Sequence, residues 1–132
     1  MFEITVTREF AAAHAIYLPD GALEPMHGHN WQVQVTVARD QLDRIETVMD
    51  FHELEAAVDA LIADWHNATL NECAPFADHD GRLVVNPTAE RVAEHIATAL
   101  ASKLPKPVRI HDVLVREAPG CWARYRPDNG QA

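Results

Sequence analysis

Residues 29–38 alternate more regularly than any other part of this chain, and the alternation restricts how the chain can fold. After His29, tryptophan and three valines hold the odd positions, whereas the even positions hold asparagine, glutamine, threonine and alanine. Successive side chains of a β-strand point to opposite faces, so this pattern predicts a strand with one buried and one polar face. Residues 2–14 also alternate, and residues 15–28 are rich in proline and glycine, which predicts two strands joined by a loop.

Three histidines stand where these two predicted strands would meet. His27 and His29 are two residues apart and share a strand face, and His14 closes the first alternating stretch. If the strands pair as a hairpin, the end of the first lies beside the start of the second and the three imidazoles converge. Three imidazole ligands with an open fourth position are typical of catalytic zinc sites, so zinc is the predicted cofactor. The alternative is three partly exposed loop histidines without a metal.

Two amphipathic helices are predicted in the middle of the chain. Asp50 and Glu53 have the spacing of a capping box, and apolar residues follow at helical spacing. A second helix starts near Pro87 or Thr88, carries its own apolar stripe and ends before Pro105. Between the helices, residues 66–86 are expected to be irregular.

The last third of the chain returns to strand patterns. Strands are predicted over residues 108–117, with a β-bulge near His111 where the apolar parity changes, and over residues 121–126. The predicted order is β-β-α-α-β-β in one domain, residues 1–132. This order indicates an α+β fold in which two helices cover one face of a four-stranded antiparallel sheet. The exposed edges of such a sheet favour pairing with further copies of the chain.

Composition excludes several classes of function. The formal net charge is −9, and nucleic-acid binding needs a basic face, so no nucleic-acid partner is expected. No apolar run is long enough to span a bilayer and no signal-peptide pattern begins the chain, so we expect a cytoplasmic protein with no membrane partner. Two cysteines, Cys73 and Cys121, are expected to be reduced thiols.

Three further side chains are candidates for binding. Glu117 shares the parity of the buried valines in the third strand, and a carboxylate can accept two adjacent N–H groups from a purine-like or pterin-like ring. The alternative for Glu117 is an ion pair with Arg116 or Arg124. Thr88 and Glu90 first of all fit the start of a helix, and any functional role is additional to that.

Six short motifs occur in order along the chain and resemble those of one family. They are Phe10–His14, His27–Asn30, Val48–Phe51, Leu70–Asn71, Pro87–Glu90 and Val115–Glu117. Together they resemble the 6-pyruvoyl tetrahydropterin synthase family, which includes the 6-carboxytetrahydropterin synthases, over almost the whole chain.

The resemblance implies the tunnelling fold, in which three subunits join their sheets into a barrel and two trimers stack as a homohexamer. It implies zinc on His14, His27 and His29, and a pterin-like ring held by Glu117. Thr88 and Glu90 match family positions near the ring. Active relatives convert dihydroneopterin triphosphate, with zinc acidifying the hydroxyls of its side chain while a base moves protons.

The chain departs from the family pattern where the catalytic base is expected. Family members carry a cysteine four or six residues before the His-Gly-His motif, where this chain has Leu23 and Gly21. Some branches use a glutamate nearby, and Glu24 stands three residues before the motif. Where the family has an Asp-His pair before Leu-Asn, this chain has His66 and Asn67.

These departures leave three hypotheses. In the first, the protein is an enzyme that uses Glu24 or His66 as an altered base and acts on dihydroneopterin triphosphate or a related heterocycle. In the second, it binds a pterin-like ligand without turnover. In the third, it is a cupin-type metal oxygenase. The cupin pattern fits poorly, because no glutamate follows the His-x-His pair at a suitable interval. His66 also has a structural alternative, because it would favour the C-terminal end of the first helix.

Overall fold

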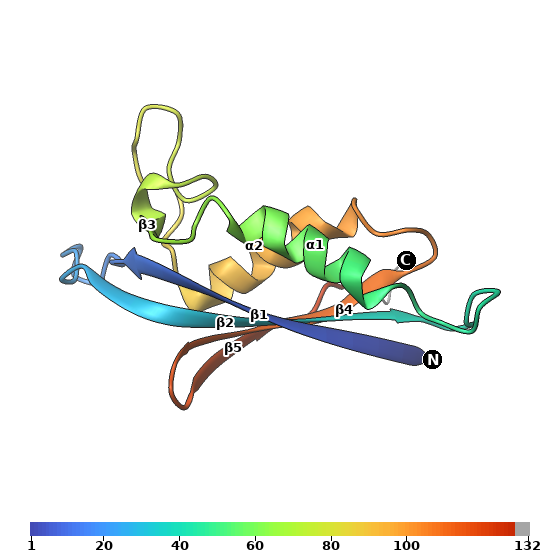
Figure 1. Ribbon diagram of the computed structural model, residues 1–132. Helices are drawn as coiled ribbons and strands as arrows, with labels where there is room; N and C mark the ends of the chain where they lie inside the picture. The colour runs from blue at the N-terminus through green and yellow to red at the C-terminus, as the bar shows by residue number, and fades with distance from the viewer. Residues whose placement is uncertain (129–132) are drawn as a thin grey trace.

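The computed structural model describes residues 1–128, so the last four residues of the predicted domain lie outside the described part. Two helices pack across one face of a twisted sheet (Figure 1). The elements in chain order are β1 (Phe2–His14), β2 (His27–Arg39), α1 (Phe51–Ile62), β3 (Ala68–Thr69), the short 3₁₀ helix η1 (Leu70–Glu72), α2 (Ala89–Ala101), β4 (Arg109–Ala118) and β5 (Cys121–Tyr125). The predicted α+β architecture is therefore confirmed.

The sheet has five strands in the order β3-β1-β2-β4-β5, and not the four that the sequence predicts. The additional strand, β3, pairs in parallel with Ala12 and Ala13 of β1, so the sheet is not wholly antiparallel. Asn67 has a positive φ of 61° and donates its backbone N–H to Ala11 O at 2.6 Å, which turns the chain onto the β1 edge. Two residues are too few to show alternation, so the sequence carries no periodic signal for β3.

The predicted hairpin of the first two strands is confirmed. β1 and β2 are antiparallel along their whole length, with His14 opposite His27 and Ala12 opposite His29. The predicted bulge is also present, because Thr36 faces Asp112 and Val37 faces Ile110, which leaves His111 as the extra residue. The register therefore brings the three histidines to one end of the sheet.

The core lies between the helices and the covered face of the sheet. Helix α1 buries Leu54, Val58 and Ile62, and α2 buries a longer stripe that includes Ile96 and Leu100. Full burial of one such side chain stabilises the fold by about 1.5–3 kcal/mol. Both helices begin at a predicted capping residue: Asp50 caps α1 through His52 N, and Thr88 caps α2 through Arg91 N. The predicted capping box is not seen in residues 1–128, because no described hydrogen bond joins Asp50 to Glu53.

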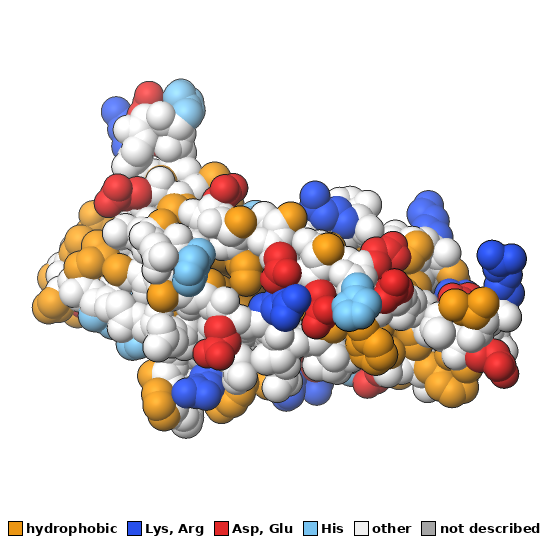
Figure 2. All heavy atoms as spheres, in the orientation of Figure 1, with side chains coloured by type: hydrophobic (Ala, Val, Ile, Leu, Met, Phe, Trp, Pro, Cys, Tyr) orange, Lys and Arg blue, Asp and Glu red, His pale blue; other side chains and the backbone are white. Residues whose placement is uncertain are grey.

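The surface carries acidic and basic side chains interspersed, without one large field of either sign on the face in Figure 2. Apolar side chains gather at the end of the molecule where β1 stops. The exposed apolar residues of the two loops at this end are Tyr17, Leu18, Leu23, Met26 and Val84. No helix of residues 1–128 is long and apolar enough to cross a membrane. Cys73 and Cys121 are free, as predicted.

Candidate functional site

The three histidines converge as the sequence predicts. One ligand atom from each of His14, His27 and His29 lies within 4.8 Å of the other two. The ring centroids are 4.7 Å apart for His14 and His27, 4.8 Å for His27 and His29, and 5.4 Å for His14 and His29. His14 comes from the end of β1 and the other two from the start of β2, so the hairpin register brings the three residues together.

Backbone carbonyls fix the orientation of two of these rings. Nδ1 of His14 lies 2.7 Å from Pro87 O, and Nδ1 of His27 lies 2.9 Å from Pro25 O. A carbonyl oxygen only accepts hydrogen bonds, so each Nδ1 carries a proton and donates it. In the neutral rings, Nε2 then presents its lone pair. A carbonyl that orients a ligating histidine in this way is typical of metal centres.

The buried nitrogens of the cluster support the same conclusion. Nε2 of His14 and Nε2 of His29 are buried and have no hydrogen-bond partner within residues 1–128. Burial is the main effect on His29 and lowers the pKa of its imidazole, which favours the neutral form that a metal ion requires. Unpartnered buried nitrogens are costly unless something binds them. The donor set therefore fits zinc.

Glu117 approaches the cluster from β4. Its carboxylate oxygens lie 3.5 Å from Nε2 of His14 and 3.8 Å from Nε2 of His29. No described ion pair joins Glu117 to either alternative partner in residues 1–128: Arg124 pairs with Asp112 at 3.0 Å, and the Arg116 guanidinium lies 6.0 Å from the ring centroid of Trp122. A carboxylate that faces nitrogen lone pairs needs a positive charge between them, supplied by a protonated ring or by a bound cation.

A pocket of about 330 Å³ opens beside Glu117. Its lining includes Glu90 and Trp122, so two carboxylates and an indole border one space. Thr88 is not part of this lining; its hydroxyl accepts a hydrogen bond from Arg91 N at 3.1 Å and caps α2. The structure therefore brings Glu90 and Glu117 to one pocket and places Thr88 outside its lining, as the residue that caps α2.

Of the two candidate bases, the described contacts place one at the cluster. A carboxylate oxygen of Glu24 lies 3.9 Å from Nε2 of His27 and accepts a hydrogen bond from Ile16 N at 3.1 Å. Nδ1 of His66 instead accepts the backbone N–H of Ala11 at 3.2 Å, on the β1 edge. Within residues 1–128 no described contact joins His66 to the histidine cluster, and its ring binds β1 where the chain turns into β3.

Several residues of the site escape the sequence patterns. Trp31 packs edge-on against His14, with ring centroids 4.8 Å apart, and donates its indole N–H to Ala12 O. The alternation of residues 29–38 predicts that Trp31 is buried, but it does not predict that Trp31 packs against the histidines. The carbonyls of Pro25 and Pro87 have no side-chain signal. Pro25 stands two residues before His27, whereas Pro87 is 73 residues from His14 and nothing in the sequence links the two.

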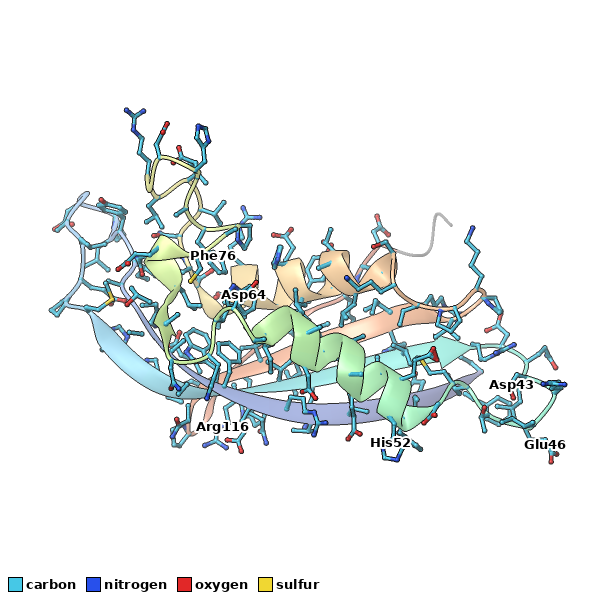
Figure 3. All side chains as sticks on the ribbon, turned by 45° about the horizontal axis from the view of Figure 1, so that its top comes forward. Asp43, Glu46, His52, Asp64, Phe76 and Arg116 are labelled. Carbon is cyan, nitrogen blue, oxygen red and sulfur yellow. The ribbon has the colours of Figure 1, made fainter. Side chains whose placement is uncertain are left out.

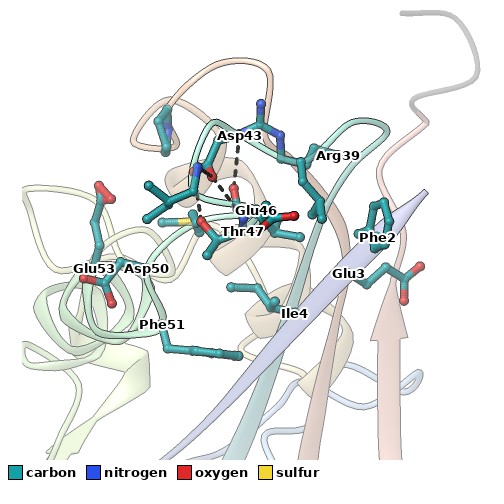
Figure 4. Close-up of a pocket in the computed structure, with 15 residues that line it drawn as sticks. Phe2, Glu3, Ile4, Arg39, Asp43, Glu46, Thr47, Asp50, Phe51 and Glu53 are labelled. Carbon is teal, nitrogen blue, oxygen red and sulfur yellow. Dashed lines mark hydrogen bonds between the residues drawn. The ribbon is translucent and has the colours of Figure 1, made fainter.

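A larger pocket, of about 810 Å³, lies at the opposite end of the sheet (Figure 4). Its lining is mainly apolar, with Phe2, Ile4 and Phe51 below a loop that carries Asp43 and Thr47. No histidine or cysteine lines it. The larger pocket therefore lacks a group of imidazoles like the one that lies beside Glu117.

The helix-covered sheet therefore carries a three-histidine cluster that could hold a metal ion, a carboxylate that faces this cluster, and a pocket beside that carboxylate. The model of the family "6-pyruvoyl tetrahydropterin synthase" matches residues 3–128, and the chain belongs to this family.

Two curated relatives are each 32% identical to it. One is the 6-carboxy-5,6,7,8-tetrahydropterin synthase of Bacillus subtilis, matched over 98% of this chain and 88% of the relative. The other is the enzyme of the same name from Synechocystis, matched over 88% of this chain and 86% of the relative.

Solved structures show the same fold. The 6-pyruvoyl tetrahydropterin synthase of Caenorhabditis elegans aligns with a TM-score of 0.75 at 21% identity, over 97% of this chain and 98% of that chain. The Plasmodium falciparum protein aligns with a TM-score of 0.73 at 20% identity, over 94% and 96%. The chain therefore has the predicted tunnelling fold.

Proposed function

We propose that this protein is a zinc-dependent enzyme of the tetrahydropterin synthase type, in which Glu24 replaces the usual thiol base. The observation that carries the proposal is the placement of two carboxylates around one histidine cluster. Glu117 lies 3.5 Å from His14, and Glu24 lies 3.9 Å from His27, on a different ring. A substrate bound between them would meet a ring anchor and a proton acceptor.

Glu117 is the proposed anchor of the pterin-like ring. A carboxylate can accept two parallel N–H bonds from the aminopyrimidinone edge of a pterin, and charge makes such bonds short and strong. Glu90 borders the same pocket and is a second acceptor for the ring. Thr88 supports the pocket by capping the helix that presents Glu90.

His14, His27 and His29 would hold the zinc ion. When bound, zinc acts as a Lewis acid and makes the substrate's hydroxyl groups more acidic. The protein's own part is to keep the rings oriented through the Pro25 and Pro87 carbonyls and to hold Glu117 at the open side.

Glu24 is the proposed general base. Its backbone N–H and one carboxylate oxygen are both bound to Ile16, so the side chain is held while it faces the cluster. General-base catalysis contributes typically ~100–10,000-fold to rate. A glutamate is described as a catalytic residue in a Plasmodium vivax 6-pyruvoyltetrahydropterin synthase of the same fold, 17% identical to this chain, which gives a precedent for a carboxylate in this role.

The test is turnover of dihydroneopterin triphosphate by zinc-loaded protein, with products separated by chromatography. Glu24→Gln should reduce kcat by about 100-fold or more and leave pterin binding intact. Glu46→Gln, in an exposed loop at the opposite end of the sheet (Figure 3), is the matched control. Binding of pterins by calorimetry without any product would favour the non-catalytic alternative, and an unchanged kcat in Glu24→Gln would refute the proposed base.

We also propose the homohexamer and the cytoplasmic location that the family resemblance predicts. In residues 1–128, β3 covers only Ala12 and Ala13 of β1, which leaves most of that edge unpaired, and β5 forms the other edge. Unpaired edges of this length favour strand pairing between copies. Light scattering should give a mass of about 88 kDa, six times the 14.7 kDa chain.

A further inference from the structure

The segment Ala15–Tyr17, directly after the first histidine, is held by two asparagine side chains. Asn71, in η1, accepts the backbone N–H of Ala15 at 2.9 Å and donates its own amide N–H to Ala15 O at 2.7 Å. The side-chain amide of Asn71 therefore forms both hydrogen bonds that a neighbouring strand would form with Ala15, the residue next to His14.

Asn86 repeats this arrangement two residues later. It accepts the N–H of Tyr17 at 2.8 Å and donates to Tyr17 O at 3.1 Å. The next residue, Pro87, supplies the carbonyl that receives Nδ1–H of His14 at 2.7 Å. The two hydrogen bonds between Asn86 and Tyr17 therefore hold the Pro87 carbonyl close to the imidazole ring of His14.

Ile16, between the two clamped residues, is bound by Glu24. Its carbonyl accepts Glu24 N–H at 3.0 Å, and its N–H donates to the Glu24 carboxylate at 3.1 Å. Every backbone N–H and C=O of residues 15–17 thus has a partner, and three separate chain segments supply them. Such complete satisfaction leaves the backbone beside His14 little freedom to move.

We propose that Asn71 and Asn86 are positioning residues of the metal centre. They fix residues 15–17, and through them the ring of His14 and the carboxylate of Glu24. This inference rests on the proposed function, because it assigns the two amides a role at the proposed zinc site. Ordinary loop stabilisation is the competing explanation, and it predicts a loss of folding stability without a specific loss at the site.

The experiment compares Asn71→Ala and Asn86→Ala with Asp43→Ala. Asp43 is a matched control, because its carboxylate also binds a loop, accepting from Ile45 N, Thr47 N and the Thr47 hydroxyl, at the opposite end of the sheet. Zinc affinity is measured by chelator competition, the geometry of the site by the visible spectrum of bound Co²⁺, and stability by urea unfolding of the metal-free protein.

Both asparagine variants should bind zinc about 10–100-fold more weakly, the range typical for partners that orient ligating histidines, and should alter the Co²⁺ spectrum. Asp43→Ala should lose stability yet bind zinc within twofold of the wild type. If an alanine variant does not fold, the serine variant at that position is measured, with the same expectation in direction. Asparagine variants that lose stability but keep wild-type zinc affinity and Co²⁺ spectrum would overturn the inference. A wild-type protein that binds no zinc would instead refute the metal centre, and the inference with it.

Discussion

The two ends of the β1–β2 hairpin differ in how their polar groups are satisfied. At the end with His14 and His27, buried ring nitrogens and a carboxylate face one another without hydrogen bonds. At the other end, Asp43 accepts three hydrogen bonds within its own loop, and these lower the pKa of its carboxyl group. The second end has the larger pocket, about 810 Å³, but its lining includes no histidine and no cysteine among residues 1–128. The convergence of unpartnered ring nitrogens, and not pocket size, therefore identifies the functional end.

The strongest test of this contrast is removal of one ligand. His29→Ala should reduce zinc affinity by at least ~1,000-fold, beyond the range expected for the groups that only orient a ligand. His111→Ala is the control, because His111 is another half-buried histidine, paired with Glu3 at 3.2 Å and not part of the cluster. Zinc content after dialysis and chelator competition measure the effect. Equal affinity in both variants would contradict the assignment of the site.

A substitution that creates a cavity at the opposite end of the sheet should lower folding stability without changing zinc affinity. Met49 is 6% exposed and lines the larger pocket. Met49→Ala should lower the free energy of unfolding by about 2–3 kcal/mol, because buried atoms are lost and a cavity remains. Urea unfolding measures this loss, and zinc affinity should stay within twofold. A large change in zinc affinity would show that the two ends are coupled, against the separation argued above.

Glu117 could anchor the pterin-like ring or act as a fourth metal ligand, and the substitution Glu117→Gln distinguishes these two roles. As the anchor of the ring, Glu117→Gln should weaken pterin binding by about 10–100-fold, since hydrogen bonds to a charged group contribute about 1.5–3 kcal/mol, and should leave zinc affinity almost unchanged. As a fourth metal ligand, it should weaken zinc binding as well. Calorimetry with a pterin and chelator competition for zinc distinguish the roles. Glu94→Gln, a surface carboxylate paired with Arg91, is the control.

Periodicity predicts the parts of this fold that repeat. The alternation of residues 2–14 and 29–38 gives the hairpin, its register and hence the meeting of His14 with His27. The parity change at His111 gives the bulge. By contrast, β3 is fixed by the backbone turn at Asn67 and by backbone pairing with β1, which no periodic side-chain pattern records.

The site divides in the same way between side chains and backbone. The three histidines are predictable because their spacing and their strand faces are regular. The carbonyls of Pro25 and Pro87 act through atoms that every residue possesses, so residue identity does not reveal them. The position of Glu24 beside His27 depends on the path of the loop 15–26. A hydrogen bond from the backbone N–H of Glu24 to the carbonyl of Ile16 joins the two ends of this loop. A loop path is set by such tertiary contacts and not by periodicity.

The smallest expected effect concerns a histidine buried away from the cluster. Half-buried His95 packs against Trp65 with ring centroids 5.5 Å apart, and burial lowers the pKa of its imidazole, as burial does for His29. In the unfolded chain its pKa returns to about 6.5. Above pH 6.5 the imidazole is neutral in both the folded and the unfolded state, so His95 does not make the free energy of unfolding depend on pH. As the pH falls below 6.5, the unfolded state binds the proton first, so the free energy of unfolding decreases until the folded pKa is passed.

His95→Gln should therefore lose less stability than the wild type between pH 7.5 and pH 5.5, when unfolding is followed in urea with a chelator present. His79→Gln is the control, because the His79 side chain is 91% exposed and its removal should leave the wild-type pH dependence in place. Equal losses in the wild type and His95→Gln would show that burial of this ring has no effect on folding. The expected difference would show that a buried imidazole alone gives pH sensitivity. The proposed zinc site depends instead on the convergence of His14, His27 and His29, the one such group found within residues 1–128.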